Sequence, residues 1–361
     1  MYDIVIVGAG PAGATLARML DNRYKILLID KRNLNEDIEY KREKCCGGLI
    51  APDAQKMLAH LGLGIPKDVL TGPQMFSVKS VDFDNGMEKH YQRHYINVDR
   101  EKFDRWLVSL IPSTVEIKFN CLFTSHKKQK DYIEVKYREG NKEFVLKTKI
   151  LVGADGATSK VRRQAFTDCT IPNTYISIQK WYKTNNEMPY YTSIFDKDIT
   201  DFYSWIIQKG SYILIGSAIL DNNEANEKFD LLIEKLRNYG FDIGEEYKKT
   251  GTLIMRTRKL KQINLIRDNV VLIGEAAGFI SPSSAEGISY ALKSGTMLAH
   301  SINNYDLKFA RNYTKQIKKI KLNIIIKNLK AFIMYNKFLR KVIMKSRVLS
   351  MDIKDINQKD K

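Results

Sequence analysis

Apolar residues gather in short runs along the chain, and three of these runs lead directly into glycine-rich turns followed by helical patterns. The first run, residues 2–7, is followed by Gly8-Ala9-Gly10-Pro11-Ala12-Gly13, by a helical pattern over 14–20, and by a second apolar run over 25–29 that ends on Asp30. A strand, a helix and a strand in this order predict a βαβ unit with parallel strands.

Two later segments repeat the passage from strand to glycine loop to helix. Residues 149–152 lead into Gly153-Ala154-Asp155-Gly156-Ala157 and a helix start over 159–163. Residues 269–273 lead into Gly274-Glu275-Ala276-Ala277-Gly278 and a helix over 286–302. Ligands of α/β sheets bind where strands pass into such loops. We therefore expect both segments to return to the sheet that the N-terminal unit begins.

The residues between the second and third loops follow a different pattern. Residues 170–260 alternate apolar and polar positions, are rich in aromatic side chains, and contain one amphipathic helical pattern near 226–239. This is typical of an antiparallel sheet, to which residues 76–98 are expected to add strands. The predicted fold class is α/β. It comprises a Rossmann-type nucleotide-binding domain (1–75, 99–168 and 262–305), an inserted antiparallel β-sheet substrate domain (76–98 and 169–261) and a basic helical C-terminal segment (306–361).

The composition agrees with a folded chain of two domains. The 361 residues are 44% hydrophobic and 28% charged, which excludes a disordered, collagen-like or small disulfide-rich protein. Four cysteines, two of them adjacent, and an N-terminus without a basic, cleavable leader favour a reducing cytoplasmic location. No apolar run reaches the roughly 18 residues of a membrane-spanning helix.

Positive charge is concentrated near the C-terminus. The net charge is +18, and residues 308–349 contain thirteen Lys or Arg and no Asp or Glu. Two apolar rows recur there at helical spacing: Phe309, Tyr313, Ile317, Ile320 and Ile324, and then Ile325, Leu329, Phe332 and Ile333. Such a helix can lie on an anionic bilayer as a peripheral membrane contact, or pack on the nucleotide domain, and both interpretations stay open. If it serves the membrane alone, truncation after Asp306 leaves the cofactor bound. Nucleic acid is not expected as a partner, because no binding motif accompanies the charge.

The N-terminal glycines indicate a dinucleotide site. Gly8 allows the tight turn, Gly10 lets the backbone approach a pyrophosphate at the helix N-terminus, and Gly13 allows the helix to pack closely on the strand. Asp30 stands seventeen positions after Gly13, at the end of the second strand, and can accept hydrogen bonds from ribose hydroxyls. This fingerprint alone does not distinguish NAD from FAD.

The three loops, in this order, resemble those of the geranylgeranyl reductase family, within the larger group of flavoproteins that share the para-hydroxybenzoate hydroxylase fold. The resemblance covers nearly the whole chain, includes an Arg-x-x-Phe-Asp-x-Trp-Leu stretch over 100–107, and implies FAD as cofactor. Glu275 stands where many hydroxylases of the fold have Asp. The FAD contacts that the resemblance implies are Gly8, Gly10, Ala12, Gly13, Asp30, Lys31, Cys45, Gly47, Gly48, Arg100, Leu122, Asp155, Gly156, Gly274, Glu275, Gly287 and Ile288.

The segment Cys45-Cys46-Gly47-Gly48 makes the chain resemble the prenyl reductases more than the hydroxylases of this fold. A Cys-Gly-Gly sequence after the first sheet segment is typical of prenyl reductases. The resemblance implies that Cys46 shapes the site or supports proton transfer to the substrate carbon. The alternative is that both cysteines are small packing residues, since free cysteine is often simply buried.

Tyr203-Ser204-Trp205 is similar to the family's Tyr-x-Trp-x-Phe-Pro stretch, which lines a lipid tunnel and is followed by Gly-x-Gly. The chain departs from this pattern, because Ile207-Gln208 replaces Phe-Pro and Ala218 replaces the second glycine. The departure puts the identity of the substrate in doubt. Alternatively, Tyr203 and Trp205 are ordinary residues on one face of a strand.

The resemblance implies an FAD-dependent oxidoreductase that reduces isolated carbon-carbon double bonds of a geranylgeranyl-type prenyl lipid. Its catalytic residues are expected to be Cys46, Tyr203 and Trp205, with no metal. The alternatives are an FAD-dependent monooxygenase or halogenase of the same fold, and a flavin-binding membrane regulator without turnover. The expected partners are a hydrophobic or lipid substrate and an electron donor that the sequence does not identify, either NAD(P)H or a redox protein such as ferredoxin.

Overall fold

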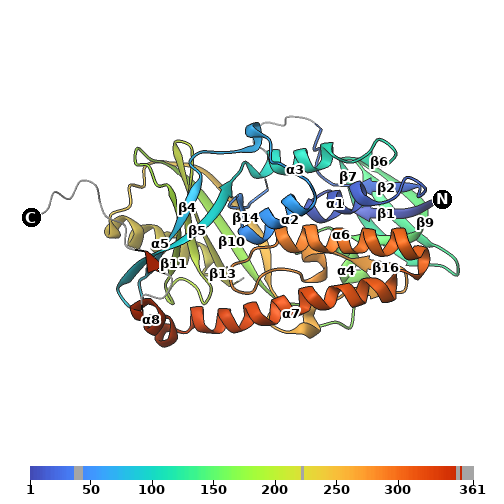
Figure 1. The fold of residues 1–361 in the computed structure, drawn as a ribbon. Helices are drawn as coiled ribbons and strands as arrows, with labels where there is room; N and C mark the ends of the chain where they lie inside the picture. The colour runs from blue at the N-terminus through green and yellow to red at the C-terminus, as the bar shows by residue number, and fades with distance from the viewer. Residues whose placement is uncertain (36–43, 221–222, 347–349, 352–361) are drawn as a thin grey trace, which may run out of the picture.

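Two β-sheets joined by helices make up the molecule, which is a computed structural model describing residues 1–35, 44–220, 223–346 and 350–351 (Figure 1). The eight-stranded sheet contains β1 (Tyr2–Val7), β2 (Ile26–Ile29), β6 (Glu116–Lys118), β7 (Cys121–Lys128), β8 (Ile133–Glu139), β9 (Lys142–Gly153), β15 (Ile266–Arg267) and β16 (Val270–Leu272). The nine-stranded sheet contains β3 (Leu49–Ile50), β4 (Met75–Asp82), β5 (Met87–Asn97), β10 (Asn173–Lys183), β11 (Tyr190–Phe195), β12 (Ser204–Lys209), β13 (Tyr212–Leu220), β14 (Glu246–Arg256) and β17 (Ser350–Met351). The helices are α1 (Pro11–Met19), α2 (Pro52–His60), α3 (Arg100–Ser109), α4 (Lys160–Ala165), α5 (Ala225–Tyr239), α6 (Ile288–Tyr305), α7 (Ala310–Tyr335) and α8 (Lys337–Ser346).

The eight-stranded sheet is built around β1, and the predicted βαβ unit is confirmed. β1 pairs in parallel with β2 and β9, β2 pairs with β6, and β9 pairs with β16. β7, β8 and β9 form an antiparallel extension. α1 begins at Pro11 rather than at residue 14, because a proline without an N–H fits the first helical position. The loops after β1, β9 and β16 therefore meet at one edge of the sheet.

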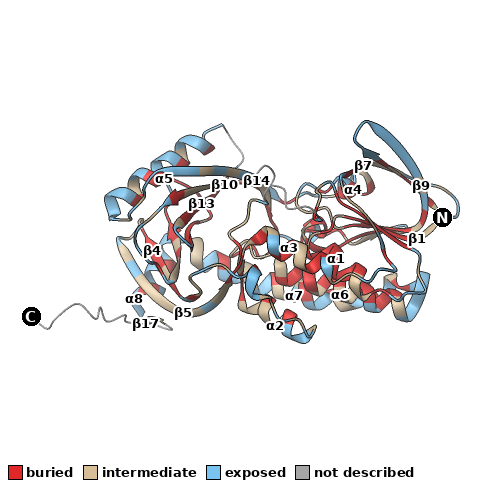
Figure 2. Ribbon diagram, turned by 90° about the horizontal axis from the view of Figure 1, so that it is seen from above, coloured by how far each residue is buried: buried red, intermediate tan, exposed pale blue. Residues whose placement is uncertain are grey.

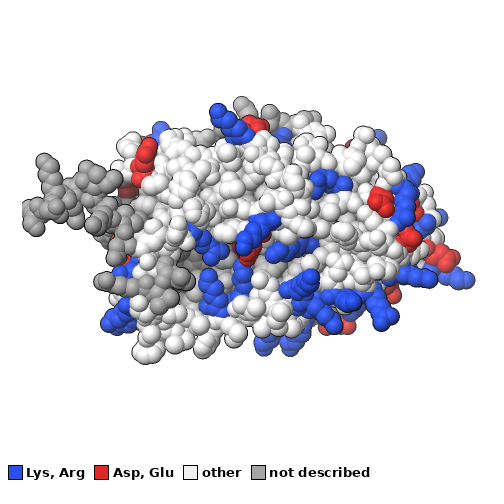
Figure 3. Space-filling model, viewed as in Figure 1, with Lys and Arg blue, Asp and Glu red and all other residues white. Residues whose placement is uncertain are grey.

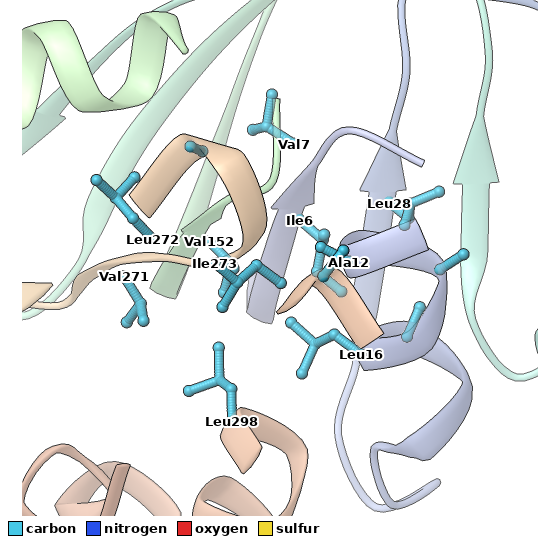
Figure 4. Packing of buried hydrophobic residues seen from close by; sticks show 14 of the residues in the cluster. Ile6, Val7, Ala12, Leu16, Leu28, Val152, Val271, Leu272, Ile273 and Leu298 are labelled. Atoms are coloured by element: carbon cyan, nitrogen blue, oxygen red, sulfur yellow. The ribbon is translucent and has the colours of Figure 1, made fainter. Parts of the chain in front are cut away.

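The core of this sheet lies between its central strands and the helices α1 and α6. Ile6, Val152, Leu16 and Leu298 are fully buried, and Figure 4 shows side chains from β1, β16, α1 and α6 meeting there. Strands that are covered on both faces are apolar at every position, as the burial of all four β2 residues illustrates. Burial of one such aliphatic side chain contributes about 1.5–3 kcal/mol.

The nine-stranded sheet stands at the other end of the molecule (Figure 2). Its pairs are antiparallel with one exception, β4 and β11, which are parallel with Ser77 opposite Tyr190. β4 comes from a distant segment and not from a hairpin with β11, so no tight turn fixes its direction. α5 packs on the sheet through Phe229, Leu232 and Leu236, which are fully buried.

The C-terminal helices run along the molecule from one sheet to the other (Figure 1). The first apolar row of α7, from Phe309 to Ile324, belongs to the core of the eight-stranded sheet. The interpretation that this helix packs on the nucleotide domain is therefore confirmed for its first apolar row. Only the second apolar row is left at the surface. None of the described helices is long and apolar enough to cross a membrane. The extreme end, 352–361, lies outside the described residues.

Candidate cofactor and substrate site

The turn between β1 and α1 presents the start of a helix to open space. Gly8 has φ +107°, and a Cβ on it would lie 2.5 Å from the carbonyl oxygen of Ala154, so this position requires glycine. A Cβ on Gly13 would lie 1.9 Å from the carbonyl oxygen of Gly8. α1 has no side-chain cap, and a Cβ on Gly10 would meet nothing within 4 Å. The free N–H groups of the first turn can therefore bind a pyrophosphate.

Asp30 ends β2 beside this turn and is held from two sides. Its Oδ2 accepts a hydrogen bond from the N–H of Ala9 at 2.7 Å, and its Oδ1 accepts one from the N–H of Arg32 at 2.8 Å. The Arg32 guanidinium pairs with Asp30 and also with Asp104, whose Oδ2 lies 2.9 Å from the Arg32 Nη1. Asp104 in turn pairs with Arg100. This chain of ion pairs fixes the carboxylate that the sequence predicts to bind ribose.

The same ion pairs keep Asp104 and Arg32 charged at neutral pH. Burial by itself raises the pKa of Asp104, but Arg100, Lys44 and Arg32 outweigh it and hold that pKa well below its ordinary value. Burial lowers the pKa of Arg32, whereas Asp104 and Asp30 raise it above its ordinary value. The Nε of Arg100 is buried and has no partner among the described residues, which leaves a donor for a bound ligand.

Asp155 follows β9 in the second loop. Its Oδ2 accepts hydrogen bonds from the N–H groups of Lys160 at 2.7 Å and Val161 at 3.2 Å, where α4 begins. Its Oδ1 is buried without a partner in the described part of the chain, and burial raises the pKa of the carboxyl group. An unpartnered buried oxygen at this edge is the kind of atom that a cofactor hydroxyl satisfies.

Arg162 ties the second loop to the third, and the sequence analysis did not single it out. Its guanidinium donates to the carbonyl oxygens of Ala157 at 2.5 Å and Ala276 at 2.9 Å. Glu275 accepts a hydrogen bond from the N–H of Met255 at 3.2 Å, and burial raises its pKa. A basic residue in the helix after a glycine loop was the available sequence signal, but it does not say which carbonyls the side chain reaches.

The remaining predicted cofactor residues lie around the same edge. Gly287 precedes α6 and Ile288 begins it, at the end of the third loop. The N–H of Cys121 donates to the carbonyl oxygen of Asp30 at 2.9 Å, which brings the start of β7 and the neighbouring Leu122 beside Asp30. Lys31 is exposed just beyond Asp30. Their contacts with a cofactor stay predictions.

These features fit FAD. The uncapped helix start suits its pyrophosphate, the fixed Asp30 suits its ribose, and the unpartnered Arg100 Nε and Asp155 Oδ1 offer further bonds. Cβ atoms on Gly156 and Gly287 would meet nothing within 4 Å, so the second and third loops are open to a ligand as well.

The Cys-Gly-Gly segment leads towards the nine-stranded sheet. The Cys45 Sγ donates to the carbonyl oxygen of Ser177 on β10 at 3.6 Å, and burial raises its pKa to about 11. Gly48 has φ +62°, and a Cβ on it would lie 2.3 Å from the carbonyl oxygen of Val98. The Cys45 thiol is therefore directed at β10, and a cofactor contact by Cys45 would have to come from its backbone.

Lys209, at the end of β12, anchors this segment. Its Nζ donates to the Asn97 Oδ1 at 2.6 Å and to the carbonyl oxygens of Val98 at 2.9 Å and Gly48 at 3.4 Å. Burial lowers the pKa of Lys209 to about 7, although electrostatic interactions with Cys46 and Asp99 oppose this. The sequence analysis missed Lys209, because its partners come from separate segments of the chain.

Cys46 lies between the ion pairs and the aromatic residues. Cys46 is near enough to interact electrostatically with Arg100 from the cofactor side and with Lys209 and Tyr203 from the sheet side. Its surroundings differ from those of Cys45, whose hydrogen bonds are with the nine-stranded sheet. Of the two thiols, Cys46 is therefore the one placed at the junction of the two sheets.

Tyr203 and Trp205 form a wall beside the Cys-Gly-Gly segment. Their ring centroids are 5.4 Å apart, as the spacing of two residues along a strand predicts. A Cβ on Gly47 would lie 2.6 Å from Ile207 Cδ1, and a Cβ on Gly216 would lie 2.3 Å from the Trp205 ring. The Trp205 Nε1 is buried and has no partner within the described chain.

Phe202, from the same aromatic stretch, and two residues that the sequence did not reveal, Tyr335 and Arg256, complete this wall. The Tyr203 hydroxyl donates to the carbonyl oxygen of Ser284 at 2.7 Å, and the Tyr335 hydroxyl donates to that of Ser283 at 2.8 Å. The Arg256 guanidinium lies 4.5 Å from the ring centroid of Tyr335 and 4.2 Å from that of Phe202. Phe202 directly precedes Tyr203 in the chain, whereas Tyr335 and Arg256 belong to distant segments, so no local pattern links those two to Tyr203.

The described residues contain no group of three or more His, Cys, Asp or Glu that could hold a metal ion. A largely apolar pocket of about 370 Å³ is lined by residues of α2 and β5, including Leu58 and Ile96. None of its lining residues belongs to the three loops or to the Cys-Gly-Gly segment, so we do not include it in the site.

Comparisons with known proteins bear on this geometry. Residues 1–231 match the family model described as FAD binding domain. Protein CbrA of Escherichia coli O6:H1 (strain CFT073) is 38% identical over 96% of this chain and 94% of its own length, and CbrA of Shigella sonnei is 38% identical over 96% and 97%.

Solved structures share the fold. A geranylgeranyl bacteriochlorophyll reductase-like protein from Thermoplasma acidophilum has a TM-score of 0.79 and 20% identity, over 95% of this chain and 90% of that one. A triple mutant of the flavin-dependent brominase Bmp2 has a TM-score of 0.68 and 19% identity, over 96% and 94%. At these identities the likeness shows the fold alone. The family model shows more, because it spans over half of the chain: the chain belongs to the FAD-binding domain family and is a flavoprotein.

Proposed function

We propose that this flavoprotein reduces isolated carbon-carbon double bonds of a prenyl lipid. The observation that carries the proposal is the place of Cys46, between the Arg100 side of the cofactor loops and the wall of Tyr203 and Trp205. The fold is common to reductase-like and halogenase structures, so it does not by itself decide between the two reactions.

Reduction of an alkene needs a hydride on one carbon and a proton on the other. Bound FAD, reduced by an external two-electron donor, supplies the hydride. The Cys46 thiol gives its proton to the second carbon, which completes the saturated bond and leaves a thiolate. Lys209 has a pKa of about 7 and interacts with Cys46, so it can stabilise that thiolate until a proton returns from solvent.

The neighbouring side chains suit an apolar chain. Ile207 presents its Cδ1 to Gly47, Trp205 presents its Nε1, and neither side chain carries a charge. The hydrogen bond of the Tyr203 hydroxyl to Ser284 fixes the ring, so it can position a substrate without moving. Ile207 stands where the family pattern has Phe, and we propose that this changes the shape of the lipid that fits.

Mass spectrometry of a geranylgeranyl lipid tests the proposal. The lipid is incubated without oxygen with the reduced holoprotein, as wild type, Cys46→Ser and Cys45→Ser. We expect wild type to add two hydrogen atoms for each double bond. Because serine is a much weaker acid than cysteine, Cys46→Ser should slow the addition by about 100-fold or more, as loss of a general acid does.

Cys45→Ser is the matched control, since its hydroxyl can keep the hydrogen bond to Ser177. Equal rates for the two variants would remove Cys46 from the mechanism. An unchanged lipid with wild type, together with oxygen-dependent turnover of an aromatic substrate in air, would replace the reductase with a monooxygenase or halogenase.

A further inference from the structure

The two apolar rows of α7 lie on opposite sides of the helix. Tyr313 and Ile324 are 0% exposed and pack on the eight-stranded sheet, whereas Leu329 and Phe332 are 65% and 67% exposed. Residues three and four apart share one face of a helix. The exposed apolar residues of α7 therefore form one row: Leu322, Ile325, Ile326, Leu329, Phe332 and Ile333.

The row continues on α8, where Phe338 is 70%, Val342 50% and Ile343 41% exposed. On the other side of α8, the buried Arg340 pairs with Asp82 at 2.7 Å and Asp84 at 2.6 Å, which fixes the helix against β4. We call the exposed residues of α7 and α8 together the apolar stripe. Contiguous apolar surfaces of this extent mark interaction sites.

Basic residues flank the apolar stripe, and residues 308–349 contain no carboxylate side chain. Figure 3 shows Lys and Arg gathered along the lower edge of the molecule, where Figure 1 places α7. The exposed basic residues of the two helices are Arg311, Lys315, Lys318, Lys319, Lys330, Lys337, Lys341 and Lys345. An apolar row between cations is complementary to a layer of anionic headgroups over hydrocarbon.

We propose that this face of α7 and α8 binds the surface of an anionic lipid bilayer. The apolar stripe enters the headgroup and acyl-chain boundary, and the flanking lysines meet lipid phosphates. A second copy of the chain is a poorer occupant, because a two-fold interface would bring the lysines of both copies together without carboxylates from these helices.

This docking brings the aromatic wall close to the bilayer. Tyr335, at the end of α7, is bonded to Ser283, and its ring centroid lies 5.2 Å from that of Phe202. The helix that meets the lipid thus also contributes a side chain beside Tyr203. Entry of a prenyl substrate from the bilayer follows only if the proposed function holds. Binding of this face to lipid does not depend on the proposed function.

Flotation of the full-length holoprotein with vesicles tests the proposal. Vesicles of equal parts phosphatidylglycerol and phosphatidylcholine are compared with pure phosphatidylcholine, at low and high salt. The test variant is Leu329→Gln with Phe332→Gln. The control is Phe76→Gln with Val145→Gln, which changes two side chains outside these helices that are 60% and 55% exposed. The flavin absorbance of each purified variant shows whether it has folded.

We expect wild type and control to float with the anionic vesicles and to be released by salt. The test variant should bind roughly tenfold more weakly, because two apolar side chains no longer enter the interface. Equal binding of wild type to both vesicle types would overturn the proposal. The proposal would also be overturned if the wild type eluted as a dimer in gel filtration and only the test variant eluted as a monomer. Reduction of a lipid dissolved in detergent is measured on the same test variant. Because no bilayer is present, this assay tests the proposed function independently of membrane binding.

Discussion

At the scale of single residues, Lys209 shows how a charge can be buried with no carboxylate among its hydrogen-bond partners. Its ammonium donates to three oxygen atoms, all of them neutral, so burial decides its protonation and lowers its pKa to about 7. The ordinary value of a lysine, 10.5, applies in the unfolded chain. Between these two values the unfolded chain binds more protons, so this group makes the fold more stable as the pH rises.

Lys209→Met isolates this effect. We expect the unfolding free energy of wild type minus that of the variant to increase by about 1–2 kcal/mol between pH 7 and pH 9. Below about pH 7 the difference should level off, since lysine is then protonated in both states. Urea unfolding of the FAD-saturated proteins at each pH gives the values. A difference that stays constant with pH would mean that Lys209 keeps an ordinary pKa.

Local sequence reveals single residues only where their partners are near in the chain. Gly8 and Gly13 belong to one turn, and Tyr203 and Trp205 are two residues apart with neighbouring rings. Their spacing along the chain was therefore enough to predict that they lie together. Lys209 meets Gly48 and Asn97 only because β12 passes beside both. No spacing along the chain encodes such a meeting.

At the scale of elements, α7 carries two apolar faces with different roles. Ile324 is 0% exposed and belongs to the core, while its neighbour Ile325 is 40% exposed. The structure favours the opposite of the expectation that truncation after Asp306 leaves the cofactor bound. Removal of α7 would uncover the core that it covers, next to α6 and the third cofactor loop, so we predict loss of FAD.

A matched pair of substitutions separates the two faces. Ile324→Ala should cost about 2–5 kcal/mol of unfolding free energy, since it leaves a cavity in a packed core. Ile325→Ala should cost less than about 0.5 kcal/mol, as exposed substitutions usually do. Thermal or denaturant unfolding checks both values. Similar losses at the two positions would show that both faces are buried in solution.

The elements themselves were largely predictable, and their contacts were not. Apolar runs followed by glycine turns identify β1, β9 and β16 with the loops behind them, because each signal is local. Helical spacing also predicted both apolar rows of α7, but it does not indicate which row packs against the rest of the protein. That choice depends on the shape of the neighbouring sheet and helices.

At the scale of the whole molecule, the site exists only where the two sheets meet. One sheet carries the three loops that we expect to bind FAD, and the other carries the aromatic wall. The Cys-Gly-Gly segment, the loop of residues 281–287 and α7 connect them through Gly48, Ser284 and Tyr335. A lipid double bond placed at this junction lies between hydride and proton sources, and that is the central claim of the proposed reaction.

Anaerobic reoxidation of the reduced flavin tests this claim most directly. The holoprotein is reduced chemically, mixed with a geranylgeranyl lipid in detergent without oxygen, and followed by its flavin absorbance. We predict that oxidised flavin returns in proportion to the double bonds saturated, and that a fully saturated lipid of the same length leaves it reduced. Flavin that stays reduced with both lipids and is reoxidised only by air would contradict the account.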